Sequence, residues 1–362
     1  MKVRTDLNLI KTEWCDIPLL FPALNIKNLW LKYYHDEQVE KWLEVWKYKI
    51  YWSEIKDCDY VVFPKNYDLK YLKSLRNISK IAKKYNKKVI VFYMSDEENK
   101  LPHIENLIVF RSSMNSNNPS NEYPMPWFPE DLINYCNNPY NNIVKDKPSI
   151  WYVGYYAYYS LITKIRYYVY KILMYIVRLK PINYSIYLFF NYIYPNEHLY
   201  NYITIVWSAW TYRKSIIDIL KKEKRIKFNF IERKRWWTLY EKDSYRKEYI
   251  DNMINSDFPL VIRWRWNFSF RLSEVISLWK IPIFIDTDCI LPFSDKIDYK
   301  ELFILIPYSD RNNLYDYIKK YMVKNWNKLG LIQKEIRQVY EEYYTLTGFY
   351  MNIIEHILKT NN

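Results

Sequence analysis

The residues best suited to chemistry are gathered in one stretch, 261–293, which reads VIRWRWNFSFRLSEVISLWKIPIFIDTDCILPF. Arg263 and Arg271 carry guanidinium groups, which pair with phosphate oxygens through two parallel hydrogen bonds. Ser269 is a good helix N-cap, because its hydroxyl can accept a hydrogen bond from a free backbone N–H of the first turn. The N–H groups at such a helix start attract phosphate. The stretch therefore predicts a site for a phosphorylated ligand.

Carboxylates accompany these cations. Glu274 lies three residues after Arg271 and shares its helix face, while Asp286 and Asp288 follow the next predicted strand at the same rim. A carboxylate beside a phosphate is costly unless it accepts hydrogen bonds, and sugar hydroxyls would supply them. We therefore expect a nucleotide that carries a sugar.

The elements that must position these residues alternate between strand and helix. Strands separated by helices favour a parallel sheet that is covered on both faces, and ligands of such sheets bind beyond the carboxyl ends of the strands. Helical patterns cover 68–86, 212–224, 244–256, 269–279 and most of 310–358. Apolar runs predict strands at 59–64, 87–96, 106–111, 149–155, 225–232, 258–263, 281–286 and 301–307.

The length of 362 residues suits two domains. The polar stretch 112–147 is rich in Asn, Pro and Ser and indicates a long loop and linker. We therefore expect a first domain over 1–145 and a second over 146–330, which carries a Tyr-rich basic insertion at 156–210. A helical tail over 331–362 completes the expected organisation.

The second predicted domain resembles the exostosin family of glycosyltransferases over 226–306. The family signature reads roughly R-G-x-G-N-F-S-x-R-x-x-E-x-L, followed by G-x-I-P-V and by an acidic turn before L-P-F. The chain matches this signature at Arg263, Asn267, Phe268, Ser269, Arg271 and Glu274, then at Ile281-Pro282-Ile283, Asp286-Thr287-Asp288 and Leu291-Pro292-Phe293. The match is specific over 226–306 and weak elsewhere.

The resemblance implies a GT-B fold, in which two Rossmann-like, doubly wound α/β domains face each other across a cleft. It implies an inverting glycosyltransferase that moves a hexosyl or glycuronosyl group from a nucleoside diphosphate donor, for which UDP is the expected nucleotide. The acceptor would be a glycan or a lipid-linked glycan of polysaccharide biosynthesis. Neither a metal nor another cofactor is implied.

The resemblance also assigns roles by position. Arg263, Ser269 and Arg271 would bind the diphosphate, and Glu274 would bind ribose or sugar hydroxyls. Inversion requires a base that deprotonates the acceptor hydroxyl, and Asp96, at the polar end of its predicted strand, is the candidate. The alternative interpretation of Asp96 is a solvated loop acid. The remaining substrate-binding candidates are Asn267, Asp286 and Asp288.

The chain departs from the signature at its glycines. Trp264 and Trp266 replace two of them, and Trp279 lies where the third is expected; the whole chain has 3 Gly and 15 Trp. Three interpretations remain open. The site has lost donor binding and is a non-catalytic glycan-binding or scaffolding relic, the indoles stack on a base or sugar, or the codons are UGA, which some bacterial lineages read as glycine.

The net charge of +14 suits an anionic partner. The segment 161–180 is strongly amphipathic, which favours either a helix packed on the second domain or an interfacial helix on anionic lipid. Nucleic-acid binding is disfavoured because no helix-turn-helix, zinc or RNP pattern accompanies the basic run 211–247, whose simplest interpretation is a solvated face.

The expected location is the cytoplasm, either free or at the periphery of a membrane. The four cysteines are far apart and form no CxxC pattern, so they indicate neither a zinc site nor a disulfide framework. We also find no signal-peptide pattern and no apolar stretch long enough for a spanning helix.

Overall fold

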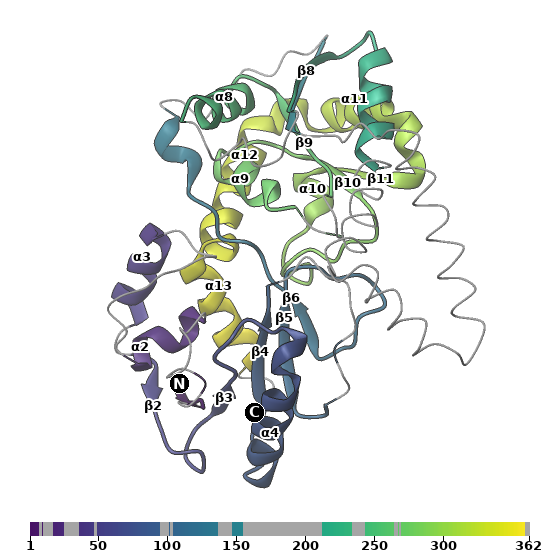
Figure 1. The fold of residues 1–362 in the computed structure, drawn as a ribbon. Coiled ribbons are helices and arrows are strands. Elements are labelled where there is room, and N and C mark those ends of the chain that lie inside the picture. Colours follow the sequence, from purple (N-terminus) through teal and green to yellow (C-terminus); the bar gives the residue numbers. More distant parts are fainter. Residues whose placement is uncertain are drawn as a thin grey trace, which may run out of the picture.

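The structure contains two parallel β-sheets, arranged one above the other in Figure 1. It is a computed structural model, and it describes residues 1–6, 9, 17–24, 36–46, 49–94, 101, 104–136, 147–154, 212–233, 243–263, 267 and 269–358. Each sheet is flanked by helices, so the predicted architecture of two parallel α/β units is confirmed.

The first sheet has six strands in the order β2-β1-β3-β4-β5-β6, and every neighbouring pair is parallel. Its longest pairing joins β4 to β5, in register from Val89 opposite Leu107 to Tyr93 opposite Arg111. The strands are β1 (Lys2–Arg4), β2 (Tyr51–Trp52), β3 (Tyr60–Val62), β4 (Val89–Tyr93), β5 (Leu107–Arg111) and β6 (Glu122–Pro124).

The second sheet has five strands in the order β11-β10-β9-β7-β8, again all parallel. Counted from its own first strand, the first sheet runs 2-1-3-4-5-6 and the second 2-1-3-4-5, so in both the winding direction reverses between the first strand and the third. In the second sheet this switch point lies between β7 and β9. The strands are β7 (Ser149–Gly154), β8 (Lys227–Glu232), β9 (Phe258–Val261), β10 (Ile283–Asp286) and β11 (Ile304–Pro307).

Helices connect and cover the strands of both sheets. The first part of the chain holds η1 (Pro18–Leu20), α2 (Phe21–Leu24), α3 (Asp36–Trp46), η2 (Leu69–Tyr71), α4 (Leu72–Lys84) and η3 (Leu132–Tyr135). The second part holds helical residues 212–222, then α8 (Asp243–Ile254), α9 (Arg271–Ser277), α10 (Tyr299–Leu302), η5 (Tyr308–Asn313) and α11 (Leu314–Asn325). The last helices are η6 (Trp326–Lys328), α12 (Leu329–Val339), η7 (Tyr340–Tyr344), α13 (Leu346–Asn352) and η8 (Ile353–Leu358).

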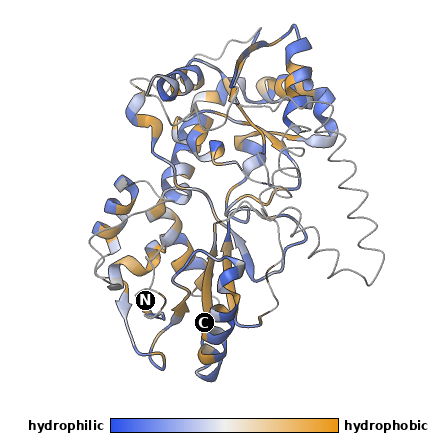
Figure 2. Ribbon diagram, in the orientation of Figure 1, coloured by the Kyte–Doolittle hydropathy of each residue, from blue (hydrophilic) through white to orange (hydrophobic). Residues whose placement is uncertain are grey.

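Apolar patterning accounts for these elements. All residues of β4 and β5 are buried, as expected for parallel strands that are covered on both faces. Helix α4 buries Leu75, Ile78 and Ala82, spaced three and four apart, and turns its lysines to solvent. Figure 2 shows this contrast, with the central strands orange and the outer face of α4 blue.

The carboxyl ends of the two sheets face each other. The Oγ of Ser116, shortly after β5, donates a hydrogen bond of 2.8 Å to Oδ2 of Asp288, shortly after β10. Two residues after Asp288 and two residues before Ser116, the backbone N–H of Ile290 donates to the carbonyl of Met114 over 3.2 Å. The carboxyl edges of both sheets, where ligands bind in open α/β folds, therefore meet at one level of the molecule.

The C-terminal helices return from the second sheet to the first, as the yellow ribbon in Figure 1 shows. Arg337 of α12 binds both carboxylate oxygens of Asp131, each over 2.8 Å, and donates to the carbonyl of Ser277 over 2.7 Å. Beyond it, α13 packs against α3. The hydroxyl of Tyr60 in β3 donates to the carbonyl of Leu358. The predicted helical tail is thus part of the packing of the first sheet.

Several elements differ from the sequence-based expectation. Strands β1, β2 and β6 and helix α3 were not predicted, and the expected loop 112–147 contains β6 and η3. Strands β1, β2 and β6 have only two or three residues and lack the long apolar runs of the longer strands, which is why they escaped detection. The segments 155–211 and 234–242, including the amphipathic stretch 161–180, lie outside the described residues. Among the described residues, no helix combines the length and the apolar composition that crossing a bilayer requires.

Candidate functional site

The candidate site lies at the switch point of the second sheet, where β7 and β9 end. Ile150 and Trp151 of β7 pair with Phe258 and Pro259 of β9, and both strands run to the same carboxyl edge. In open α/β sheets, ligands bind beyond the carboxyl ends of the strands at such a switch point. The guanidinium groups of Arg213, Arg263 and Arg271 are anchored at this edge.

Arg271 is the most deeply anchored of the three. Only 8% of the residue is exposed, and its Nη2 donates a hydrogen bond of 2.8 Å to the carbonyl of Val153 near the end of β7. Its guanidinium carbon lies 4.6 Å from the ring centroid of Tyr152, 5.4 Å from that of Trp151 and 5.9 Å from that of Tyr249. An arginine remains charged at neutral pH, so the aromatic faces stabilise a cation inside the fold.

Arg213 is a site residue that sequence reasoning missed. It belongs to the run 211–247, which was interpreted as a solvated face, yet only 4% of it is exposed. Its Nε donates a hydrogen bond of 3.0 Å to the carbonyl of Arg263, just after β9. Burial lowers the pKa of Arg213 to about 10, and the neighbouring Arg271 cation acts in the same direction. The guanidinium carbon of Arg213 lies 5.9 Å from the ring centroid of Tyr152, and nothing in the sequence indicated that these two distant residues are neighbours.

Arg263 lies beside Arg213 at the end of β9. Its guanidinium carbon is 5.1 Å from the ring centroid of Tyr212, and its Nη1 is at hydrogen-bond limit, 3.5 Å, from Oγ1 of Thr287. The side chain therefore extends from β9 toward the end of β10. The next residues, Trp264, Arg265, Trp266 and Phe268, lie outside the described part of the chain.

Glu274 lies inside the fold and is already hydrogen-bonded. Its Oε1 accepts from Nη1 of Arg246 over 2.9 Å, and its Oε2 accepts from the hydroxyl of Tyr249 over 2.5 Å. Burial raises the pKa of Tyr249 and the adjacent carboxylate raises it further, so the tyrosine stays a donor. The same hydroxyl is 3.4 Å from Nε of Arg271, which links the carboxylate to the cation. A role for Glu274 toward ribose remains a prediction.

Asn267, Thr287 and the two aspartates form a compact group at the end of β10. Asn267 is 2% exposed, donates to the carbonyl of Asp288 over 2.5 Å and accepts from the Thr287 hydroxyl. Asp286 accepts from the backbone N–H of Cys289 over 3.0 Å, which closes the turn. In this arrangement Asn267 holds the turn and Asp288 contacts Ser116 of the opposite sheet. Their predicted contacts with a substrate remain predictions.

The predicted N-cap at Ser269 is wrong. The N-cap of α9 is Phe270, which is in the right-handed helical region and makes no side-chain cap, while Ser269 offers only its carbonyl to the N–H of Leu272 over 3.0 Å. Helix α9 is also shorter than the predicted 269–279, with seven residues from Arg271. The phosphate-binding argument therefore depends on side chains rather than on this helix start.

Trp279 has a backbone conformation that suits glycine. Its φ is 61°, in the left-handed region, directly after the C-cap of α9. Its N–H donates to the carbonyl of Ile276 over 3.1 Å, and the N–H of Lys280 donates to that of Val275 over 3.3 Å. These two bonds form a Schellman motif, whose left-handed residue is usually glycine.

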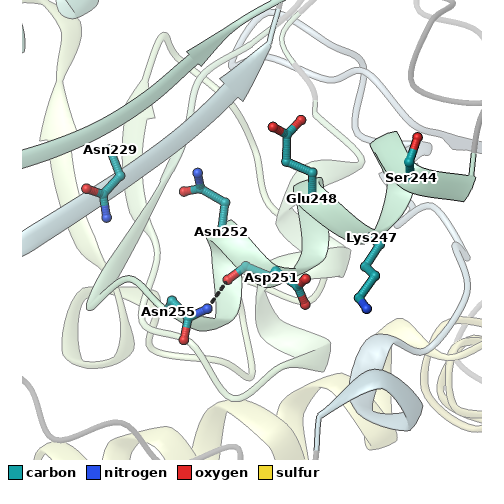
Figure 3. Close-up of a pocket in the computed structure, with 7 residues that line it drawn as sticks. All are labelled: Asn229, Ser244, Lys247, Glu248, Asp251, Asn252 and Asn255. Carbon is teal, nitrogen blue, oxygen red and sulfur yellow. Dashed lines mark hydrogen bonds between the residues drawn. The ribbon is translucent and has the colours of Figure 1, made fainter.

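The main surface depression is lined by other residues than those predicted for the site. A polar depression of about 500 Å³ runs along α8 beside the edge strand β8 (Figure 3), and its lining is made of Asn229, Ser244, Lys247, Glu248, Asp251, Asn252 and Asn255. None of these residues belongs to the predicted site. Asp96, the candidate base, lies outside the described residues. Where the structure is described, no three His, Cys, Asp or Glu side chains are grouped so as to hold a metal ion.

Comparison with known proteins gives partial similarities. The chain matches no profile of a known protein family. Over 115 residues, 30% of the chain, it is 28% identical to the Exostosin-1 homolog of Caenorhabditis elegans, and the match spans 29% of that relative's length. The pneumococcal O-GlcNAc transferase GtfA, solved in complex with UDP and GlcNAc, aligns with 83% of this chain and 56% of its own, at a TM-score of 0.30 and 11% identity. The chain thus matches less than a third of the curated relative, and these similarities do not by themselves assign it to a family.

Proposed function

We propose that the chain is a glycosyltransferase of exostosin type and GT-B architecture, which transfers a hexosyl or glycuronosyl group from a nucleoside diphosphate donor with inversion. The observation that carries the proposal is the buried Arg271 cation at the switch point of the second sheet. Among the described residues, no carboxylate forms an ion pair with Arg271. A buried cation of this kind costs free energy that a bound anion would recover.

The neighbourhood of Arg271 supports a diphosphate rather than a neutral ligand. Arg213 and Arg263 are anchored at the same edge, and the nearest carboxylate, Glu274, is neutralised by Arg246. Although burial acts to lower the pKa of Arg246, the Glu274 carboxylate raises it above its ordinary value. The local charge is therefore positive, which suits a phosphorylated donor such as a UDP-sugar.

The catalytic base and the acceptor are proposed from the sequence alone. Asp96 would act as the base that deprotonates an acceptor hydroxyl, and a glycan or a lipid-linked glycan would be the acceptor. The cytoplasm is the proposed location, with docking on an anionic membrane through 161–180. No metal or cofactor enters the proposal, since the arginines would neutralise the leaving diphosphate.

A second candidate is a non-catalytic glycan-binding or scaffolding protein on the same fold. The observation that favours it is the replacement of the signature glycines by Trp264 and Trp266, because indoles restrict the close backbone approach that a phosphate requires. Such a protein would bind a glycan but would not release UDP from a UDP-sugar.

Titration of the whole chain with UDP by calorimetry, at low salt, tests the proposal. We expect wild type to bind UDP and Arg271→Met to bind it at least about tenfold more weakly, since a hydrogen-bonded charge contributes about 1.5–3 kcal/mol. Methionine keeps much of the side-chain volume and removes a buried charge, so the variant should fold. Absence of UDP binding by wild type would overturn the proposal.

A turnover assay then separates the two candidates. UDP-sugars are screened for UDP release in the presence of glycan acceptors, with Lys319→Met, an exposed change on α11, as the matched charge control. Release that Arg271→Met abolishes and Lys319→Met preserves supports the enzyme. Binding of glycans without any release supports the relic.

A further inference from the structure

Tyr152 lies next to Arg271 at the switch point. It is fully buried in β7, and its ring reaches along the strand toward Gly154. A Cβ placed on Gly154 would come within 3.0 Å of both Cε1 and the hydroxyl oxygen of Tyr152. A side chain at the last position of β7 would therefore require the ring of Tyr152 to shift by a few tenths of an ångström. The tyrosine hydroxyl is thus held at the carboxyl edge of the strand.

Two neighbouring buried groups at this edge have no partner other than each other. Among the described residues, neither the hydroxyl of Tyr152 nor Nη1 of Arg271 has a hydrogen-bond partner outside this pair, although the other two guanidinium nitrogens of Arg271 are engaged. The guanidinium carbon lies 4.6 Å from the tyrosine ring centroid, so the two groups are neighbours. Buried polar groups without partners are rare in native proteins, and each requires an explanation.

The hydroxyl is unnecessary for packing. Phenylalanine would present the same ring to Phe230, which stacks on Tyr152 with centroids 6.1 Å apart, and to the guanidinium of Arg213 at 5.9 Å. Replacing a buried unpaired hydroxyl by hydrogen is neutral or stabilising. Within the described part of the chain, phenylalanine would therefore be at least as stable as tyrosine at this position. A ligand that accepts a hydrogen bond from the hydroxyl would account for the tyrosine.

The chemistry of the missing ligand atom follows from its neighbours. Nη1 of Arg271 donates only and is charged, and the tyrosine hydroxyl can donate beside it. The guanidinium of Arg213 adds a second buried cation on the same ring. An oxygen that carries negative charge satisfies both donors at once and offsets the charge of the cations.

We propose that the Tyr152 hydroxyl and Nη1 of Arg271 together bind one phosphoryl oxygen of the donor diphosphate. This inference rests on the proposed function for the identity of the ligand, while the donor pair itself is a property of β7 and α9. Tyr152 is then a binding residue that neither the family signature nor the spacing of charges in the sequence indicates.

The test compares wild type with Tyr152→Phe, using UDP and inorganic pyrophosphate as probes. We expect Tyr152→Phe to bind both probes about tenfold more weakly, as the loss of one charge-assisted hydrogen bond predicts. The thermal midpoint of the ligand-free variant should equal or exceed that of wild type. A hydroxyl with a purely structural role would give the opposite pattern, with a lower midpoint and unchanged binding.

A matched control is Tyr340→Phe. Tyr340 is also fully buried, and its hydroxyl also lacks a partner among the described residues, but it lies in η7, which packs against α12, α13 and α9 and is not part of the carboxyl edge of β7. This variant should keep the wild-type affinity for both probes. Equal affinities of wild type and Tyr152→Phe for pyrophosphate would overturn the inference, even if UDP binds, and so would wild type that binds no pyrophosphate. Pyrophosphate binding that depends on Tyr152, without UDP binding, would support the donor pair and contradict the proposed function.

Discussion

Trp279 occupies a backbone conformation that raises the free energy of the folded state. A φ of 61° brings Cβ close to the following carbonyl oxygen, which costs an L-residue about 1–2 kcal/mol. The Schellman hydrogen bonds at the end of α9 nevertheless require this conformation. We predict that Trp279→Gly is at least as stable as wild type and about 1 kcal/mol more stable than Trp279→Ala, because only glycine avoids the Cβ clash. Urea unfolding of the three proteins measures these differences.

Alanine is the appropriate control because both variants lose the same indole contacts. Equal stabilities of the Gly and Ala variants would show that the left-handed backbone is not maintained in solution. The position bears on the open question of the indoles, since a glycine there fits the interpretation that UGA codons specify glycine at 264, 266 and 279. UGG codons at these positions in the gene would exclude that interpretation.

Arg271 shows what residue types alone leave undetermined. The pair Arg271 and Glu274 was expected on a helix face that borders the ligand, and Leu272 and Val275 on the core face. In the structure both faces of α9 are buried, because the aromatic residues of β7 and α8 surround the arginine. Helical periodicity predicts which residues share a face, but it cannot predict what packs against that face.

The end of α8 depends on a buried lysine. Lys280 is fully buried, and its Nζ donates to the carbonyls of Ile254 over 2.6 Å and Ser256 over 3.3 Å. Burial lowers the pKa of Lys280 to about 8 from 10.5. Between these values the unfolded chain binds more protons than the folded chain, so stability rises with pH in that window and is pH-independent below it.

We predict that the free energy of unfolding of wild type, relative to Lys280→Met, increases by about 1–2 kcal/mol between pH 7.5 and pH 9.5. Unfolding in urea at both pH values measures this difference in free energy between the two proteins. Lys319→Met, which removes an exposed lysine of α11, serves as the control for general effects of charge removal. If the free energy of unfolding of wild type, relative to Lys280→Met, decreased as the pH rises, Lys280 would gain rather than lose proton affinity on folding.

At the scale of elements, long apolar runs predicted the long central strands correctly but did not reveal the short strands at the edges of the first sheet. The buried runs VIVFY and LIVFR became β4 and β5, and the IFID part of the predicted strand IPIFID became β10, because parallel strands covered on both faces are almost continuously apolar. Strand β2 has two residues and β6 contains a proline, so their formation depends on neighbours already in place. Arg213 was missed for a related reason, since its burial depends on Tyr152 from a distant strand.

The whole molecule is held together by its last helices. The sequence predicted a helical tail after the second unit, and helical periodicity could not predict that this tail packs on the first sheet. Phe349 of α13 is fully buried, with its ring centroid 5.9 Å from that of Phe110 in β5 and 5.4 Å from that of Phe128. Its ring also lies 6.1 Å from Phe293 of the second unit. One side chain thus touches both units.

This shared packing predicts that the two sheets unfold together. Phe349→Ala should destabilise the protein by about 3–5 kcal/mol, because it leaves a cavity between aromatic rings of both units. Hydrogen exchange of β5 and of β10, followed by mass spectrometry during urea unfolding, should show the same midpoint in wild type and an equal decrease at both strands in the variant. Met351→Ala, on the exposed side of the same helix at 38% exposure, should leave both midpoints close to wild type. If only β5 lost protection in Phe349→Ala, α13 would stabilise the first unit alone. The prediction that the two sheets unfold together would then be wrong.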